Sequence, residues 1–327
     1  MNTPTIADLG EHEVLRRLRP FCAAVVGDDA AVLPLPEGEQ LVVTTDVLVD
    51  GVHFCDRTLP PRSLGWRAAA VNLSDLAAMG AHPLGLTVGL TLPANTTWSW
   101  LEALYQGITD CLHHYGGTIV GGDLCRSDYR SLAITALGSV APARALYRRQ
   151  AQARQTLIAT GVHGASRAGL ALLLGELDEV SEGAVWIQAH QRPVPRFDAI
   201  SVLQTLMPHT AKVAVMDSSD GLADAVIQIC RQSQVGAALL RSQLPIPAGL
   251  IDAVGLPTAE NWTLYGGEDF ELVLSLPGDI AQRFIQALPS SQIIGQTTPG
   301  PEVCLIDDLE QGSDIPLSQA QGYQHFG

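Results

Sequence analysis

Apolar residues along this chain recur at every second position in some stretches and at every third or fourth position in others, which predicts strands alternating with helices. Strands are expected at 22–26, 41–49, 84–92, 118–120, 131–141, 156–160, 213–216 and 271–276. Helices are expected at 1–18, 68–80, 98–114, 168–177 and 220–232. This order predicts an α/β fold with mixed sheets, and a chain of 327 residues is long enough for two domains.

The helix predicted at 68–80 consists almost entirely of small residues. Its apolar positions recur at helical spacing, which predicts one buried face and leaves Asn72, Ser74 and Asp75 off that face. Small side chains let a second backbone or a ligand come close, so we expect the Asp75 carboxylate to be crowded and to need a cation or hydrogen-bond donors. The alternative is a helix whose Asp75 merely faces water.

Composition excludes several classes of protein. The formal charge of −15 argues against a nucleic-acid surface. No stretch approaches the roughly 20 apolar residues of a membrane helix, and the amino terminus lacks the basic-then-apolar form of a signal peptide, so we expect a cytoplasmic protein. The six cysteines form no C-x-x-C pair, which predicts reduced and mostly buried thiols.

Acidic residues recur beside glycines or at the ends of predicted strands. The stretches are Asp28-Asp29, Thr44-Thr45-Asp46, Gly121-Gly122-Asp123, Asp217 to Asp220, and Glu268-Asp269. Carboxylates and Thr hydroxyls are oxygen ligands that favour Mg²⁺ over zinc or copper, and phosphates commonly complete its coordination. Together with Asp75 they predict a multi-metal site for a nucleotide or another polyphosphate. A plain turn at Asp28-Asp29 and helix capping by Ser219 and Asp220 are the alternatives.

Common phosphate-binding motifs are absent from the sequence. Lys212, the only lysine, follows no glycine loop, so there is no P-loop, and the protein-kinase motifs are missing as well. The glycine loop at 161–167 is a weak candidate for an anion site at a helix N-terminus. A basic cluster is either a solvated linker or a contact to nucleotide phosphate: Arg144, Arg148, Arg149 and Arg154.

Seven stretches, in this order, resemble the thiamine-monophosphate kinase family: GDDAAV (27–32), TTDVLVDGVHF (44–54), NLSDLAAMGAHP (72–83), GGD (121–123), DSSDGL (217–222), GGEDFEL (266–272) and GYQHF (322–326). That family is grouped with aminoimidazole ribonucleotide synthetase and selenophosphate synthetase. The resemblance implies a homodimer. It also implies an amino-terminal α/β domain at 1–142 that binds metal and ATP and forms a dimer-interface β-barrel, and a carboxy-terminal α/β domain at 143–327 that completes the active-site cleft.

The resemblance also implies roles for residues at matching motif positions. The magnesium ligands would be Asp29, Thr44, Thr45, Asp46, Asp75, Asp123, Asp217 and Asp220. ATP would contact Gly122, Asp123, Arg148, Ser219 and Tyr105, and thiamine monophosphate would contact His53, Glu268 and Tyr323. Arg148 and Asp220 are candidates for supporting the transition state and the metal. No general base is expected, because the acceptor is already a phosphate oxygen.

The implied reaction is direct, Mg²⁺-assisted in-line transfer from ATP, which gives thiamine diphosphate and ADP without a phosphoenzyme. One alternative is another ATP-using member of the same superfamily. A selenophosphate synthetase would want a reactive Cys in an amino-terminal glycine loop, and a hydrogenase-maturation relative would want a carboxy-terminal Cys. The other alternative is a non-catalytic nucleotide or metal sensor, which departures from the family pattern at Leu124 and at 148–155 favour.

Overall fold

The computed structural model describes residues 3–27, 29–208, 210–307 and 314–322. The chain folds into two compact units. The amino-terminal unit contains Met1–Leu76 and Ala81–Pro142, and the carboxy-terminal unit contains Ala77–Gly80 and Ala143–Gly327. No helix in the described part of the chain is both long enough and apolar enough to cross a membrane.

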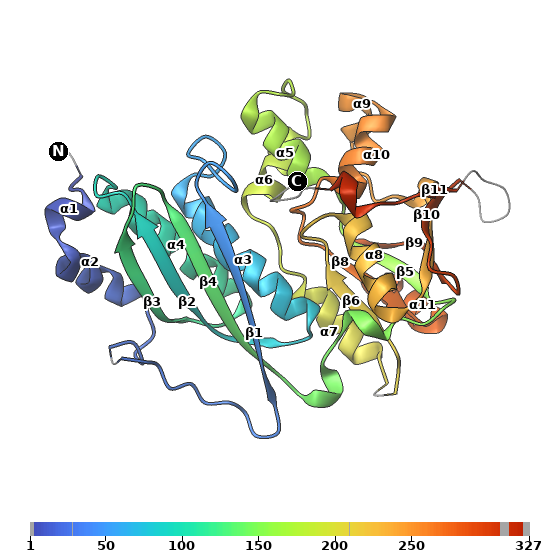
Figure 1. Cartoon of the computed structure of the whole chain (residues 1–327), viewed down its shortest axis with the longest axis horizontal. Helices are drawn as coiled ribbons and strands as arrows, with labels where there is room; N and C mark the ends of the chain where they lie inside the picture. The colour runs from blue at the N-terminus through green and yellow to red at the C-terminus, as the bar shows by residue number, and fades with distance from the viewer. Residues whose placement is uncertain (1–2, 28, 209, 308–313, 323–327) are drawn as a thin grey trace. The chain divides into compact units, whose positions relative to one another are not determined.

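The amino-terminal unit is built on a four-stranded sheet with the order β1-β4-β2-β3. Its strands are β1 (Gln40–Val49), β2 (His82–Leu92), β3 (Ile119–Arg126) and β4 (Ser131–Val140). β4 pairs antiparallel with β1 and β2, whereas β2 and β3 are parallel. Two long helices lie against one face of the sheet, α3 (Pro61–Ala78) and α4 (Trp98–Tyr115) (Figure 1).

Alternation along the strands separates a covered face from an open one. On β4, Leu132, Ile134 and Ala136 are fully buried. On the edge strand β1, Leu41, Val43 and Val47 point to the opposite face and are each at least half exposed, at 54%, 56% and 50%. The sheet therefore leaves an apolar face uncovered in the single chain.

Helices α3 and α4 touch backbone to backbone. A Cβ added at Gly65 of α3 would lie 1.9 Å from Leu104 O, and one added at Gly107 of α4 would lie 1.9 Å from Arg62 O. This confirms the close approach expected of a small-residue helix. The expected polar face is wrong, however: Asn72 and Ser74 are fully buried, and the Asn72 amide donates to Ala68 O of the same helix at 3.0 Å.

The carboxy-terminal unit contains a sheet of seven described strands with the order β11-β10-β7-β9-β5-β8-β6. Among the described strands of this sheet, only the pair β10 and β7 is parallel. The strands are β5 (Thr156–Thr160), β6 (Ala214–Asp217), β7 (Gly236–Leu240), β8 (Leu272–Leu276), β9 (Ser291–Thr298), β10 (Val303–Ile306) and β11 (Ile315–Pro316). Both sheets are open in the single chain, and the mixed α/β class is confirmed.

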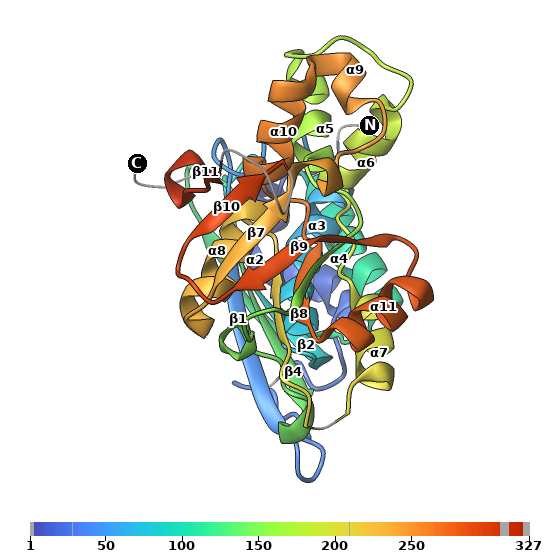
Figure 2. The same ribbon diagram turned by 90° about the vertical axis from the view of Figure 1, so that its right-hand side faces the viewer.

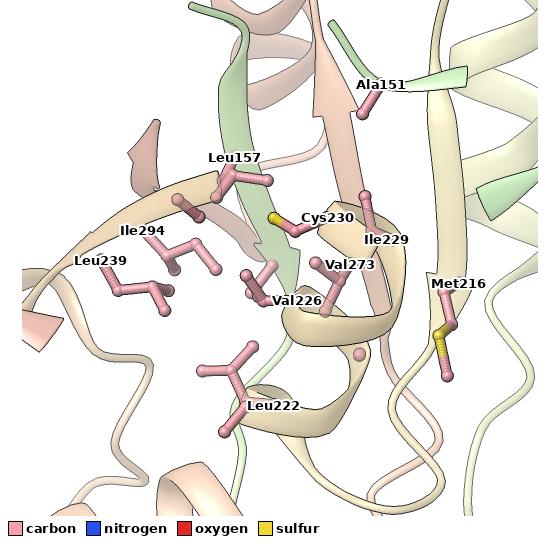
Figure 3. Packing of buried hydrophobic residues seen from close by; sticks show 14 of the residues in the cluster. Ala151, Leu157, Met216, Leu222, Val226, Ile229, Cys230, Leu239, Val273 and Ile294 are labelled. Carbon is pink, nitrogen blue, oxygen red and sulfur yellow. The ribbon is translucent and has the colours of Figure 1, made fainter. Parts of the chain in front are cut away.

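Helices cover both faces of this second sheet. Figure 2 shows α8 (Leu222–Ser233) on one side, with α7 (Phe197–Leu206) and α11 (Gly278–Ala287) on the other. Val226 and Ile229 of α8 pack with Leu157 (Figure 3), whereas the neighbouring Ile158 belongs to the cluster on the opposite face. The remaining helices of this unit are α5 (Ala165–Leu174), α6 (Gly183–Gln191), α9 (Leu250–Val254) and α10 (Leu256–Tyr265).

Several expected elements differ from the structure. The helix expected at 1–18 is two helices, α1 (Ile6–Leu9) and α2 (Glu11–Leu18), because Gly10 adopts a φ of 75° between them. The strand expected at 22–26 is reduced to isolated bridges, such as that from Cys22 to Ile119. The strand expected at 118–120 continues to Arg126, so Asp123 lies within β3 rather than after it.

Candidate functional site

The crowded carboxylate expected on α3 is present. Asp75 accepts a hydrogen bond of 2.5 Å from Thr44 Oγ1 of β1. Asp46, two residues further along β1, occupies the same half-buried face as Thr44. The groups on this face that could bind a metal ion are carboxylate and hydroxyl oxygens, which fit a hard cation such as Mg²⁺.

Thr45 lies on the other face of β1. Its hydroxyl donates to Ile134 O at 2.9 Å and accepts from Thr135 Oγ1 at 3.2 Å. Because side chains alternate along a strand, the Thr45 hydroxyl faces away from Asp75. The structure therefore brings together Thr44 and Asp75, but not the Thr45 side chain.

Asp123 lies on the opposite edge of the same sheet. The register runs from Asp46 to Ile134 on β4, then to Val88 on β2 and Gly122 on β3. Three strand spacings of about 4.8 Å place Asp46 about 14 Å from Gly122. Asp123 is exposed, and its carboxylate accepts from Cys125 Sγ at 3.3 Å.

Gly122 has a packing requirement of its own. A Cβ at this position would lie 2.3 Å from Val88 O, so β2 excludes any larger residue. Asp29 is exposed and follows the segment whose Cys22 bridges Ile119 of β3. Asp28 lies outside the described residues.

The imidazole of His53 is oriented by the end of β1. Its Nδ1 accepts a hydrogen bond of 3.1 Å from the Val49 N–H, and the main-chain N–H of His53 donates to Val49 O at 2.9 Å. Because Nδ1 is the acceptor, the neutral ring carries its proton on Nε2. In this tautomer Nε2–H is the hydrogen-bond donor of the ring.

Tyr105 is buried in the amino-terminal unit. It projects from α4 with 6% of its surface exposed, and its ring meets Phe21 edge-on with centroids 5.9 Å apart. Burial raises the pKa of Tyr105. In this setting Tyr105 is a core residue, and its contact with a nucleotide stays a prediction.

In the carboxy-terminal unit, two acidic loops are joined by main-chain hydrogen bonds. The Ser218 N–H donates to Glu271 O at 2.8 Å, and the Glu268 N–H donates to Ser219 O at 2.6 Å. Asp217 is buried at the end of β6, whereas Asp220 is exposed. The fold thus brings together the two motifs that carry Asp217, Ser219, Asp220 and Glu268.

The expected capping of α8 is wrong. The helix begins at Leu222 with Gly221 as its N-cap, and no side chain bonds to the cap. Ser219 and Asp220 therefore precede the helix, and the acid in its first turn is Asp224. Gly221 has a φ of 107°, a conformation open to glycine, which separates the acidic loop from the helix.

Arg148 lies beside α8 in the same unit. Its Nη1 donates to Gln228 Oε1 of α8 at 2.8 Å. Two other arginines of the basic cluster have separate partners: Arg144 donates to Gln204 O, and the Arg149 guanidinium lies 4.0 Å from the centre of the Tyr147 ring. Tyr323 lies outside the described residues.

An anion was expected at the glycine loop 161–167, and a side-chain carboxylate of the protein itself occupies that position. Asp269 accepts from the N–H groups of Gly164 and Ser166, at 2.7 and 2.9 Å, at the start of α5. This carboxylate occupies the helix N-terminus, so the expectation of a ligand site there is wrong. Asp269 belongs to the GGEDFEL motif, so a search for the acid that caps this loop could have found it.

Asp269 predicts a pH dependence of stability. Burial raises the pKa of its carboxyl to about 7, against the opposing effect of the two amide donors. An acid with a raised folded pKa stabilises the fold fully below its unfolded pKa of about 4, and this contribution is lost as the pH rises through about 7. We therefore expect the free energy of unfolding to fall between these values, more steeply in the wild type than in Asp269→Asn.

Urea unfolding at several pH values measures this difference. Asp279→Asn is the matched control, because Asp279 is an exposed acid in the first turn of α11. Parallel pH profiles for the wild type and Asp269→Asn would contradict the prediction.

Within the residues that the structure describes, no three His, Cys, Asp or Glu side chains gather where they could hold a metal ion. The predicted ligands lie on the β1–α3 face, on the β3 edge, in the segment before β1 that holds Asp29, and between the end of β6 and the start of α8.

Comparisons with known proteins agree with this fold and these motifs. Residues 27–140, which include the four-stranded sheet and its acidic strands, match the family model of the AIR synthase related protein, N-terminal domain. A thiamine-monophosphate kinase from Synechococcus elongatus is 49% identical, over 100% of this chain and 99% of the relative. The chain belongs to the thiamine-monophosphate kinase family.

Solved structures give the same result. The thiamine-monophosphate kinase from Stenotrophomonas maltophilia is 32% identical, with a TM-score of 0.78 over 90% of this chain and 94% of that one. AaThiL, complexed with AMPPCP and TMP, is 29% identical, with a TM-score of 0.74 over 97% of this chain and 99% of that one.

Proposed function

We propose that this chain is an ATP-dependent kinase that phosphorylates thiamine monophosphate to thiamine diphosphate. The observation that carries this function is 49% identity over the full chain to a thiamine-monophosphate kinase. The AaThiL complex with AMPPCP and TMP supports ATP and thiamine monophosphate as the two substrates. The enzyme is a transferase of thiamine diphosphate biosynthesis, and its cytoplasmic location stays a prediction.

The proposed metal is Mg²⁺. The Thr44 and Asp75 pair supports this proposal, because oxygen donors face one another across β1 and α3. When bound, Mg²⁺ would neutralise the phosphates and polarise the transferring group. The proposed ligands are Asp29, Thr44, Thr45, Asp46, Asp75, Asp123, Asp217 and Asp220.

A homodimer would explain why predicted magnesium ligands lie towards opposite edges of the four-stranded sheet. Asp46 and Gly122 occupy opposite edges of the open sheet, about 14 Å apart by three strand spacings. Pairing β1 of one copy with β3 of another would bring their acids together and close the two sheets into a barrel. The exposed apolar side chains Leu41, Val43 and Val47 would line its interior. We therefore propose that the homodimer forms a β-barrel at its interface.

The substrates are two anions, so catalysis depends on neutralising and aligning them. Arg148, which lies beside α8, is proposed to pair with ATP phosphate, together with contacts from Gly122, Asp123, Ser219 and Tyr105. His53, Glu268 and Tyr323 are proposed to contact thiamine monophosphate. The His53 geometry supports this role, because Nε2 carries the proton that a phosphate oxygen would accept.

The two domains are proposed to have different roles. Residues 1–142 are proposed to bind metal and ATP and to form the dimer, and residues 143–327 to complete the cleft. The acceptor phosphate oxygen is already a nucleophile, so the mechanism requires no general base. Asp220 is proposed to support the metal and Arg148 the transition state, with direct in-line transfer.

Incubation of the purified chain with thiamine monophosphate, ATP and Mg²⁺ tests this function. We expect ADP and thiamine diphosphate in equal amounts, and rapid acid quenching with γ-labelled ATP should leave no label on the protein. A labelled protein intermediate would overturn direct transfer. Binding of MgATP without thiamine diphosphate formation would favour another superfamily reaction or a sensor.

A further inference from the structure

Arg130 ties together both ends of the turn that carries His53. It lies just before β4, and its side chain is only 16% exposed. Its Nε donates to Asp50 Oδ2 at 2.7 Å, and its Nη1 donates to Asp56 Oδ1 at 2.6 Å. Its main-chain carbonyl also accepts from the Asp50 N–H at 3.0 Å.

Two aromatic rings flank the same guanidinium. Its central carbon lies 5.1 Å from the centre of the Trp100 ring and 5.9 Å from that of Phe54. A planar guanidinium can stack on rings while its edges hold two carboxylates, which a lysine ammonium cannot do. Arg130 therefore restrains the turn at Asp50, Phe54 and Asp56 together.

This environment rules out a direct phosphate contact as the main role of Arg130. Asp50 and Asp56 each accept a charge-assisted hydrogen bond from the guanidinium, so two negative charges already face its single positive charge. Arg130 also holds the pKa of Asp56 below its usual range. Its positive charge is neutralised by carboxylates of the protein itself, as expected of a residue that restrains a loop.

His53 sits between the restrained positions. Its ring orientation depends on the bond from Val49 N–H to Nδ1, and the turn is closed by the Gly51 N–H, which donates to Phe54 O at 2.8 Å. A shift of Asp50 or Phe54 would therefore move the imidazole. Small displacements of a binding group cost large factors in affinity or rate.

We propose that Arg130 is a positioning residue that fixes the Asp50–Asp56 turn, so that His53 presents its Nε2–H to the phosphate of thiamine monophosphate. This inference rests on the proposed function, in which His53 contacts that substrate. Arg130 acts through His53 and does not itself touch the reacting atoms.

Steady-state kinetics of Arg130→Met, His53→Ala and the double variant test the proposal. We expect Arg130→Met to raise the KM for thiamine monophosphate about tenfold and to leave the KM for ATP unchanged. Added to His53→Ala, it should change the KM less than about twofold, because both act through one contact. Arg62→Met is the matched control, since it breaks the exposed 2.7 Å pair with Asp110, which joins α3 and α4 outside this turn.

A milder variant guards against misfolding. Asp56 is 69% exposed, so Asp56→Asn should fold while it weakens only one bond to Arg130. We expect it to raise the KM for thiamine monophosphate about threefold. An unchanged KM in both variants, a rise in the KM for both substrates, or additivity with His53→Ala would overturn the positioning role.

NMR of ¹⁵N-histidine-labelled protein tests the same role without activity. The wild type should show His53 as the Nε2–H tautomer, and Arg130→Met should shift its ring nitrogens. Unchanged ring signals would refute the proposal. A wild type that makes no thiamine diphosphate would refute the proposed function instead, and the ring signals would still decide whether Arg130 orients His53.

Discussion

Asp75→Asn is expected to lower the kcat/KM for thiamine diphosphate formation by about a thousandfold, which equals about 4 kcal/mol of transition-state stabilisation. Asp75 accepts a hydrogen bond of 2.5 Å from the Thr44 hydroxyl, and Asp46 lies on the same half-buried face of β1 as Thr44. An amide keeps the size of the side chain but loses the charge that a magnesium ligand needs. The measurement is product formation against substrate concentration at saturating Mg²⁺.

Asp110→Asn is the matched control for this variant. Asp110 lies on α4, pairs with Arg62 at 2.7 Å and is one-third exposed. We expect it to retain wild-type activity. Thermal unfolding of both variants separates lost chemistry from lost structure. A folded Asp75→Asn protein with wild-type kcat/KM would contradict the proposed metal role of Asp75.

Arg196→Met is expected to lower the free energy of unfolding by about 3–5 kcal/mol, the usual cost of removing one partner of a buried ion pair. The Arg196 side chain is 7% exposed and donates to Glu271 Oε2 at 2.7 Å, while it also holds Asp198 at 2.9 Å. Without Arg196, the Glu271 carboxylate keeps the Thr160 hydroxyl as a donor but loses its cation. Urea unfolding followed by circular dichroism measures the change.

Arg16→Met provides the comparison. Arg16 pairs with Glu13 at 2.7 Å on the surface of α2, and its side chain is 72% exposed. Exposed pairs contribute little, so this variant should unfold like the wild type. Equal urea midpoints for Arg196→Met and Arg16→Met would show that the buried pair does not stabilise the fold.

Local patterns predicted several strands closely. The apolar stretch at 41–49 corresponds to β1 (Gln40–Val49), and that at 156–160 to β5 (Thr156–Thr160). A strand that is buried on one or both faces carries its apolar pattern in its own residues, so it can be predicted locally. The mixed α/β class followed from the same signal.

Predictions that depended on distant partners were less successful. Asn72 and Ser74 are polar, so the helical pattern placed them outside the core, yet both are fully buried in the folded chain. Ser219 is a residue type that often caps helices, but its carbonyl accepts a hydrogen bond from the Glu268 N–H and the helix starts at Leu222. In each case the tertiary environment overrode a local preference.

The sequence by itself determined the family and the chemical identity of the candidate site. Seven short motifs in order led to the thiamine-monophosphate kinases, and their carboxylates and hydroxyls indicated magnesium and phosphate. These are properties of residue type and order, which need no coordinates. The site roles of these residues remain predictions that the experiments above test.

Only the tertiary structure decided which of those groups meet. It joined Thr44 to Asp75, placed Asp46 and Asp123 towards opposite edges of one sheet, and put Asp269 at the start of α5. It also placed Arg130 across the turn that carries His53. Strand order and loop pairing depend on contacts between residues far apart in the chain, and local periodicity carries no information about them.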